Sequence, residues 1–211
     1  MPSSFSPPSE LAEVLHTFKK PVDVQAFLDA TPYSPEERNR CAINVIHDRM
    51  AHCLDGGLFA ALGLRWLGYP PVIIDLQPEP GMDDDHVLAI YRENGLLGAV
   101  AKSNFSGLRL REPVYRNMRE LVMSYFEDFF NVDGVKTLRY YTIPLDLSVM
   151  DVYDWMGSDA GVDEIERRLK HLRKTAVVPA AAAKLVGNAD ALSYQAGMLG
   201  VNQSGLYKPK I

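Results

Sequence analysis

The stretch Met50–Pro71, MAHCLDGGLFAALGLRWLGYPP, predicts the centre of the fold. From Cys53 to Leu67 its apolar residues recur at helical spacing, and Gly68 ends the helix. One of only two cysteines therefore stands at the first turn of a long apolar helix. Unpaired backbone N–H groups and the helix dipole favour an anion there, which lowers the pKa of a thiol. Cys53 is accordingly the candidate nucleophile; the alternative is a small buried residue, as most free cysteines are.

Further helices are expected on the N-terminal side of this stretch. Residues 1–9 are rich in Ser and Pro and are expected to be loose. Apolar spacing predicts short helices over residues 9–20 and 22–30. Another helix is predicted over residues 34–50, because Ser34-Pro35-Glu36-Glu37 has the composition of an N-cap, a first helical turn and a capping box.

An antiparallel sheet is expected on the C-terminal side. Asn94-Gly95 between two apolar runs predicts a hairpin. Short runs rich in apolar and β-branched residues predict strands over 71–76, 86–91, 97–102 and 137–143, with 108–112 as a further candidate. Helices are predicted over 114–130, 163–174 and the Ala-rich part of 176–211. Helices followed by an antiparallel sheet form an α+β pattern. We expect one domain over residues 1–175, with 176–211 as its C-terminal helical and irregular extension.

The bulk composition narrows the class of protein. The chain has 211 residues, of which 47% are hydrophobic and 23% charged, and this length buries a core without disulfides. Two cysteines do not make a disulfide framework, so free thiols are expected. The net charge of −5 argues against nucleic-acid binding driven by bulk charge. The sequence shows no signal peptide and no membrane-spanning run, so a cytoplasmic protein without membrane contact is expected. It predicts no oligomeric state.

A base for Cys53 is predicted at the edge of the hairpin. His86 opens the strand HVLAIY directly after three aspartates. If Asn94-Gly95 is a two-residue loop, His86 faces Ser103; a three-residue loop makes it face Asn104. Directly opposed residues project from the same face of a sheet, so either register brings a polar side chain beside the imidazole. Asn104 is the preferred group to orient the ring, because its amide oxygen accepts from an imidazole N–H, and Ser103 is the alternative.

Taken in order, CLDGGLFAALGLRWLGYPPVIIDL, DDHVLAIYRENG and GAVAKSN resemble the core of the transglutaminase-like and papain-like cysteine enzymes. The resemblance covers residues 50–105. It implies N-terminal helices packed on an antiparallel sheet, and amide hydrolysis or acyl transfer through a thioester. Cys53 would then be the nucleophile, His86 the base, and Asn104 or Ser103 the orienting residue. The substrate would be a small-molecule or peptide amide or thioester, and no cofactor is expected.

This chain departs from the family pattern at two places. Transglutaminase-like cores usually have Asp as the third residue, whereas the papain-like habit is Asn, as at Asn104. Papain-like enzymes carry an oxyanion-binding Gln just before the cysteine, whereas the segment here reads HDRMAH. His47, His52 or a backbone N–H would take its place. The alternative function is a catalytically inactive transglutaminase-like binding module.

A basic cluster follows the predicted site. Lys102, Arg109 and Arg111 are candidate substrate contacts, because such cations bind carboxylate or phosphate groups. The competing interpretation is ion pairing with nearby acids. No metal site is expected, because consecutive acids such as Asp83–Asp85 more often form a solvated loop. The adjacent ligand types at His52 and Cys53 likewise do not have zinc spacing.

Overall fold

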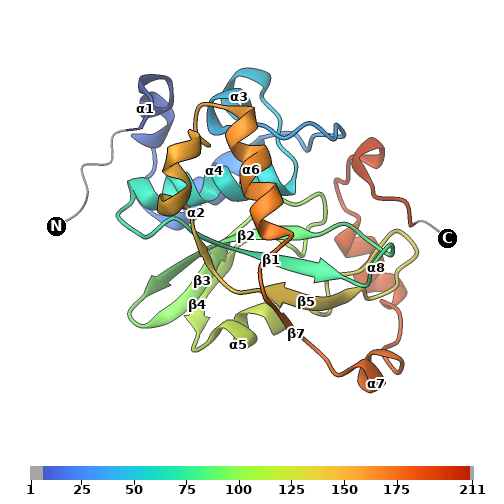
Figure 1. Ribbon diagram of the computed structural model, residues 1–211. Helices are drawn as coiled ribbons and strands as arrows, with labels where there is room; N and C mark the ends of the chain where they lie inside the picture. Colours follow the sequence, from blue (N-terminus) through green and yellow to red (C-terminus); the bar gives the residue numbers. More distant parts are fainter. Residues whose placement is uncertain (1–6, 210–211) are drawn as a thin grey trace.

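A layer of helices covers one face of an antiparallel sheet in the structure, a computed structural model that describes residues 7–209 (Figure 1). Most of the segment expected to be loose therefore lies outside the described residues. The sheet has seven strands in the order β4-β3-β2-β1-β5-β7, and β6 pairs with β1. The α+β class is confirmed. The strands are β1 Val72–Pro78, β2 His86–Glu93, β3 Leu96–Val100, β4 Arg111–Tyr115, β5 Leu138–Thr142, β6 Leu145–Asp146 and β7 Lys174–Ala176.

Helix α4, Cys53–Trp66, is the centre of the helical layer. Every residue from Cys53 to Leu64 is buried, because α4 lies between the sheet and the remaining helices. Gly57 lets the helix approach β2, since a Cβ there would stand 2.7 Å from Val87 Cγ1. The helices around it are α1 Ser9–Leu15, α2 Pro21–Ala30, α3 Ala42–Asp48 and α6 Asp159–Leu169.

The opposite face of the sheet has its own apolar core. Ile74 and Leu88 point to this face, while their neighbours Ile73 and Val87 point toward α4. The second core is closed by α5, Met118–Met123, and by the aromatic residues that follow it. Both faces of the sheet are therefore covered. Beyond β7 the chain forms two short helices, α7 Ala180–Ala183 and α8 Ala191–Gly197.

The predicted hairpin is confirmed in its two-residue form. Glu93 pairs with Leu96, and Asn94 and Gly95 both have positive φ, 49° and 84°. The ladder between β2 and β3 runs only as far as Ala89 and Val100. The register that would set His86 opposite Ser103 therefore stops before it reaches either residue.

The helix predicted over residues 34–50 is wrong in extent. Only Ala42–Asp48 of residues 34–50 is helical. Ser34 does not cap a helix; its Oγ accepts from the Glu36 N–H and from Arg40 Nη1. Arg40 is 2% exposed, and the chain folds around its guanidinium because a buried charge needs partners.

The predicted helix over 114–130 is divided. Its start belongs to β4, which replaces the strand expected over 108–112, and only α5 is α-helical. The helix expected over 163–174 instead spans Asp159–Leu169, and β7 follows it. None of the helices within residues 7–209 is long and apolar enough to cross a bilayer.

Candidate active site

Local capping explains why α4 begins at Cys53. His52 is the N-cap residue, and its Nδ1 accepts from the Leu54 N–H at 3.2 Å. Asp55 accepts from the His52 N–H at 3.2 Å and from the Arg40 N–H at 2.7 Å. Burial raises the pKa of Asp55 to about 7 despite these bonds. This network places the Cys53 side chain at the first turn, as the sequence predicts.

The thiol of Cys53 is enclosed. The residue is 7% exposed, and Sγ donates to the Asp85 carbonyl oxygen at 3.4 Å. Burial raises the pKa of Cys53 well above its usual value, and the charges of Asp84 and Asp85 add to this. The expected lowering of the thiol pKa by the helix N-terminus is therefore wrong. A partial charge of about one half at the helix end is outweighed by burial and neighbouring carboxylates.

Tyr33 is a residue of the site that the sequence did not indicate. Its side chain lies next to Cys53, whose backbone N–H and thiol influence the pKa of the tyrosine hydroxyl. Burial raises its pKa well above the usual value, and the charges of Cys53 and Asp84 contribute. Its backbone is held because Ser34 N–H donates to the Ala51 carbonyl and Ala51 N–H to the Pro32 carbonyl. A tyrosine twenty residues before the cysteine carries no local signal for this contact.

His86 is 3% exposed and is oriented by a backbone carbonyl. Nε2 lies 2.7 Å from the Leu108 carbonyl oxygen, so Nε2 carries the proton of the neutral ring. Burial lowers the pKa of His86 to about 4, which keeps the ring neutral at pH 7. Nδ1 then has a free lone pair. Among residues 7–209 no hydrogen bond to Nδ1 is found, and His86 lines the smaller of the two cavities next to Cys53.

Two cavities meet at Cys53. The smaller, of about 40 Å³, brings four predicted residues together: Cys53, His86, Ser103 and Asn104. The larger is an open cleft of about 630 Å³ between α4, the Asp84-Asp85 loop and α6. Tyr33 and Cys53 line both cavities. These four residues, distant along the chain, therefore share the lining of one cavity.

Ser103 and Asn104 reach the cavity but do not bind the imidazole. Ser103 Oγ accepts from the Phe105 N–H at 2.9 Å. Asn104 Nδ2 donates to the carbonyl oxygens of Asn202 and Gly205, and its Oδ1 accepts from the Asn202 N–H. The expected orienting role of either residue is corrected, because the Leu108 carbonyl occupies that position on the ring.

The three predicted substrate cations serve the fold instead. Lys102 Nζ donates to the carbonyl oxygens of Leu28 and Thr31, and burial lowers its pKa to about 8. Arg109 pairs with Asp29 at 3.2 Å. Arg111 donates to backbone carbonyls and stacks 4.0 Å from the centroid of the Tyr125 ring. None of the three lines either cavity at Cys53, so their predicted substrate contacts are corrected.

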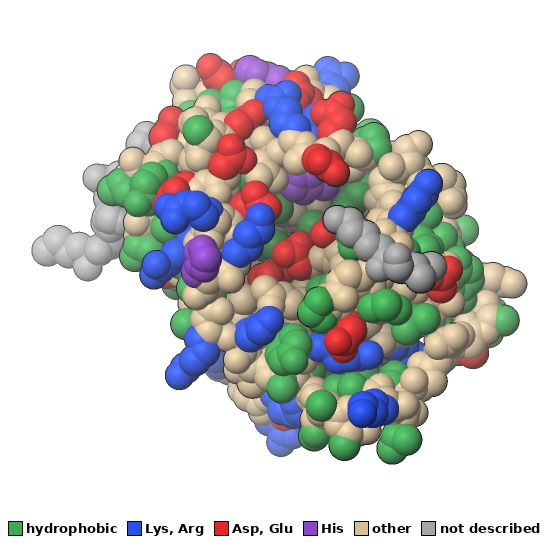
Figure 2. All heavy atoms as spheres, turned by 45° about the vertical axis from the view of Figure 1, so that its right-hand side comes forward, with side chains coloured by type: hydrophobic (Ala, Val, Ile, Leu, Met, Phe, Trp, Pro, Cys, Tyr) green, Lys and Arg blue, Asp and Glu red, His purple; other side chains and the backbone are tan. Residues whose placement is uncertain are grey.

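The cleft is predominantly acidic. Figure 2 shows carboxylates gathered in and around a hollow near the middle of the view. Burial raises the pKa of Asp85 to about 6, and the charge of Asp84 adds to the shift. The described chain contains no group of three His, Cys, Asp or Glu side chains arranged to hold a metal ion. The charged side chains that line the cleft are Glu36, Glu37, Asp84, Asp85, Glu166, Lys170 and Lys208.

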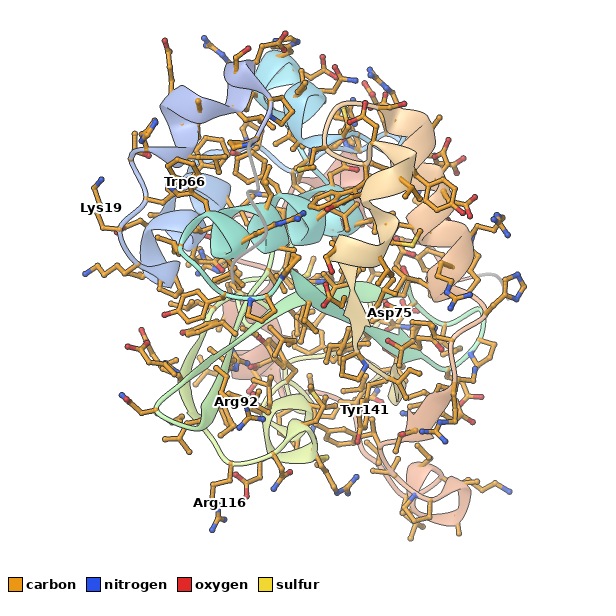
Figure 3. All side chains as sticks on the ribbon, turned by 60° about the vertical axis from the view of Figure 1, so that its left-hand side comes forward. Lys19, Trp66, Asp75, Arg92, Arg116 and Tyr141 are labelled. Carbon is orange, nitrogen blue, oxygen red and sulfur yellow. The ribbon has the colours of Figure 1, made fainter. Side chains whose placement is uncertain are left out.

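A buried carboxylate lies behind this acidic lining. Asp75, labelled in Figure 3, belongs to the central strand β1 and is 1% exposed. Its Oδ1 has no hydrogen-bond partner within residues 7–209. Burial raises the pKa of Asp75 well above its usual value, and the charge of Asp85 adds to this.

The positions of His47 and His52 decide which of them can bind an oxyanion at Cys53. His47 is on the surface, with Nε2 3.6 Å from Glu10 Oε2, and lines neither cavity at Cys53. His52 lines the cleft, and burial lowers its pKa to about 4.

Comparison with protein-family models gives no match, and a search of curated proteins finds no relative. The site must therefore be interpreted from its own geometry.

Proposed function

We propose that this protein is a thiol-dependent amide hydrolase or acyltransferase of the transglutaminase-like and papain-like kind. One observation carries the proposal: Cys53 and His86 line the same small cavity, and the Leu108 carbonyl binds Nε2 of His86, which leaves Nδ1 without a hydrogen-bond partner among the described residues. A nucleophile, a base and a group that orients the base are the parts that such chemistry requires. The proposed substrate is an amide or thioester of a small molecule or peptide.

The proposed reaction starts from a neutral pair. His86 Nδ1 takes the Cys53 proton as the sulfur attacks the substrate carbonyl carbon. The Tyr33 hydroxyl donates to the oxyanion of the tetrahedral intermediate. His86 returns the proton to the leaving amine or thiol, and a Cys53 thioester remains. Water or an amine then attacks the thioester carbonyl while His86 takes its proton; the C–S bond breaks, and His86 returns the proton to the Cys53 sulfur.

The cavity size favours hydrolysis as the second half-reaction. A cavity needs only about 10–15 Å³ to hold one water molecule. The small cavity, of about 40 Å³, has room for a water beside the imidazole. Ser103 in its lining carries a hydroxyl that such a water can contact.

The test is alkylation of Cys53 by iodoacetamide at pH 7, with the labelled peptide identified by mass spectrometry. We expect His86→Ala to lower the rate about tenfold or more, because the thiol has lost its base. His47→Ala, which changes a surface histidine, is the matched control and keeps the rate. An unchanged rate in a folded His86→Ala variant would contradict the proposal.

A catalytically inactive binding module is the second candidate. The raised pKa of Cys53 favours it, because a thiol that resists ionisation is a weaker nucleophile. Incubation with a p-nitrophenyl ester separates the two candidates. An acyl group on Cys53, or release of p-nitrophenol that Cys53→Ser abolishes, supports the enzyme. An unmodified thiol without such release supports the module.

A further inference from the structure

The C-terminal segment Asn202–Lys208, here called the strap, forms a wall of the proposed site. In Figure 1 the chain leaves α8 and runs back beside the helical layer toward its C-terminal end. Ser204–Lys208 line the open cleft, and Gly205 and Tyr207 line the small cavity as well. The strap therefore lies where the cleft and the cavity adjoin, next to Cys53.

The strap is attached to two separate segments of the chain, at Asn104 and at Tyr33. At the first, Asn104 Nδ2 donates to the Asn202 carbonyl at 3.0 Å and to the Gly205 carbonyl at 3.3 Å, and its Oδ1 accepts from the Asn202 N–H at 2.8 Å. At the second, Asn202 Nδ2 donates to the Tyr33 carbonyl at 2.9 Å. Gly205 also packs against Tyr33, since a Cβ there would stand 2.9 Å from Cδ1 of the ring.

Polar bonds rather than apolar burial hold the strap in place. No residue from Val201 to Pro209 is fully buried. Asn104, by contrast, is 9% exposed, and both its amide nitrogen and its amide oxygen form hydrogen bonds with the strap. Segments with few buried apolar contacts open at a small fraction of the global unfolding free energy. Loss of the amide of Asn104 removes three of the hydrogen bonds that keep the strap closed.

We propose that the strap is an access gate that selects which molecules reach Cys53, with Asn104 as the positioning residue that holds it closed. Closed, the strap narrows the passage to the thiol and admits only slim groups. Open, it joins the small cavity to the cleft and admits bulky ones. The biological role of this gate rests on the proposed function, but its effect on the access of molecules to Cys53 does not.

The experiment compares two thiol reagents of different size. Iodoacetamide and fluorescein maleimide are reacted separately with the full chain at pH 7, and the rate at Cys53 is followed by peptide mass spectrometry. We expect Asn104→Ala to raise the ratio of the bulky rate to the small rate about tenfold, because the gate then spends more time open. Asn188→Ala is the matched control; Asn188 is an exposed asparagine of the same extension, and the ratio stays unchanged.

Cys41 reports whether a variant is folded. This thiol is 1% exposed, so it stays unlabelled while the fold is intact. If Asn104→Ala exposes Cys41, Gly205→Ala provides the same test, because its added methyl pushes the strap away from Tyr33. An unchanged ratio in a variant that keeps Cys41 protected overturns the gate.

The two proposals fail in different ways. If His86→Ala leaves Cys53 alkylation unchanged while the strap variants raise the size ratio, the proposed chemistry fails and the gate remains. If His86→Ala slows alkylation and the size ratio does not move, the chemistry remains and the gate fails.

Discussion

The two cysteines of this protein occupy nearly equivalent positions in very different surroundings. Cys41 is the N-cap residue of α3, and Cys53 is the first residue of α4. Both are buried, and burial raises the pKa of each thiol, to about 11 for Cys41. Cys41 lines neither cavity of the site, whereas Cys53 lines both, one of them with His86. A helix N-terminus alone therefore does not set the proposed nucleophile apart; what distinguishes Cys53 is the cavity that it shares with His86.

Replacement of each cysteine by serine should produce the largest difference in activity between the two sites. We expect Cys53→Ser to lower ester hydrolysis by about 10³-fold or more, because a serine hydroxyl is a far weaker nucleophile beside a neutral imidazole. Cys41→Ser should keep the activity of the folded fraction. The measurement is release of p-nitrophenol per folded molecule. Equal losses in both variants would remove the functional distinction between the thiols.

The hydrogen bonds around Cys41 can be removed by a substitution that does not contact Cys53. Asp159 Oδ1 accepts from the Cys41 N–H and from Asn44 Nδ2, both at 2.8 Å, and Asp159 pairs with Arg38. Asp159→Ala should cost about 2 kcal/mol of unfolding free energy in urea denaturation, because it leaves a backbone donor unpaired. Asp163→Ala, on the next turn of α6, is the control and should cost much less.

The same carboxylate predicts a pH dependence. These hydrogen bonds hold the pKa of Asp159 at about 2, below its unfolded value, despite the opposing effect of burial. Its contribution to stability is therefore present above about pH 4 and is lost as pH falls toward 2. The Asp159→Ala penalty should shrink over that window, while Cys53 alkylation at pH 7 stays at the wild-type rate. A slower Cys53 would show that the two regions are coupled.

The smallest effect is expected at Asp75, whose charge raises the pKa of Cys53. The raised pKa of Asp75 means that the folded state holds its proton more tightly, so wild-type stability falls as pH rises above about 4. Asp75→Asn removes this penalty and should stabilise the protein by about 1 kcal/mol at pH 8, and by less at pH 5. Thermal unfolding at the two pH values measures the difference.

Asp75→Asn should also sharpen the contrast between the thiols. Removal of a nearby negative charge makes the Cys53 thiolate easier to form, so its alkylation should rise about twofold to threefold. Cys41 should stay unlabelled. Asp133→Asn changes an exposed aspartate and is the control for both readouts. A gain that is larger at pH 5 than at pH 8 would contradict the assigned pKa direction.

Local sequence patterns were enough to predict the helix and the hairpin that carry the proposed site. The apolar spacing after Cys53 predicted α4, and Asn94-Gly95 predicted the hairpin, because each signal lies within one element and its turn. The failures have longer-range causes. The register argument from His86 to Asn104 assumed that β3 continues, but β3 ends at Val100 and the chain then leaves the sheet.

The long-range partners were decided by burial. Lys102 looked like a substrate contact by its charge, yet it binds the carbonyls of Leu28 and Thr31, which need a donor where the chain is buried. The helix predicted over residues 34–50 is likewise shorter in the structure, because the buried guanidinium of Arg40 binds both Ser34 and Asp48. Such choices depend on which groups lose water in the folded state.

By itself, the sequence determined that a cysteine begins a buried helix and that a histidine begins the strand beside it, since both follow from short-range periodicity and turn chemistry. Only the tertiary structure decided what surrounds them: a backbone carbonyl orients His86, Tyr33 lines both cavities with Cys53, and Asn104 holds the strap. The physical reason is that hydrogen-bond partners of buried polar groups are chosen by distance in space, which local sequence does not encode.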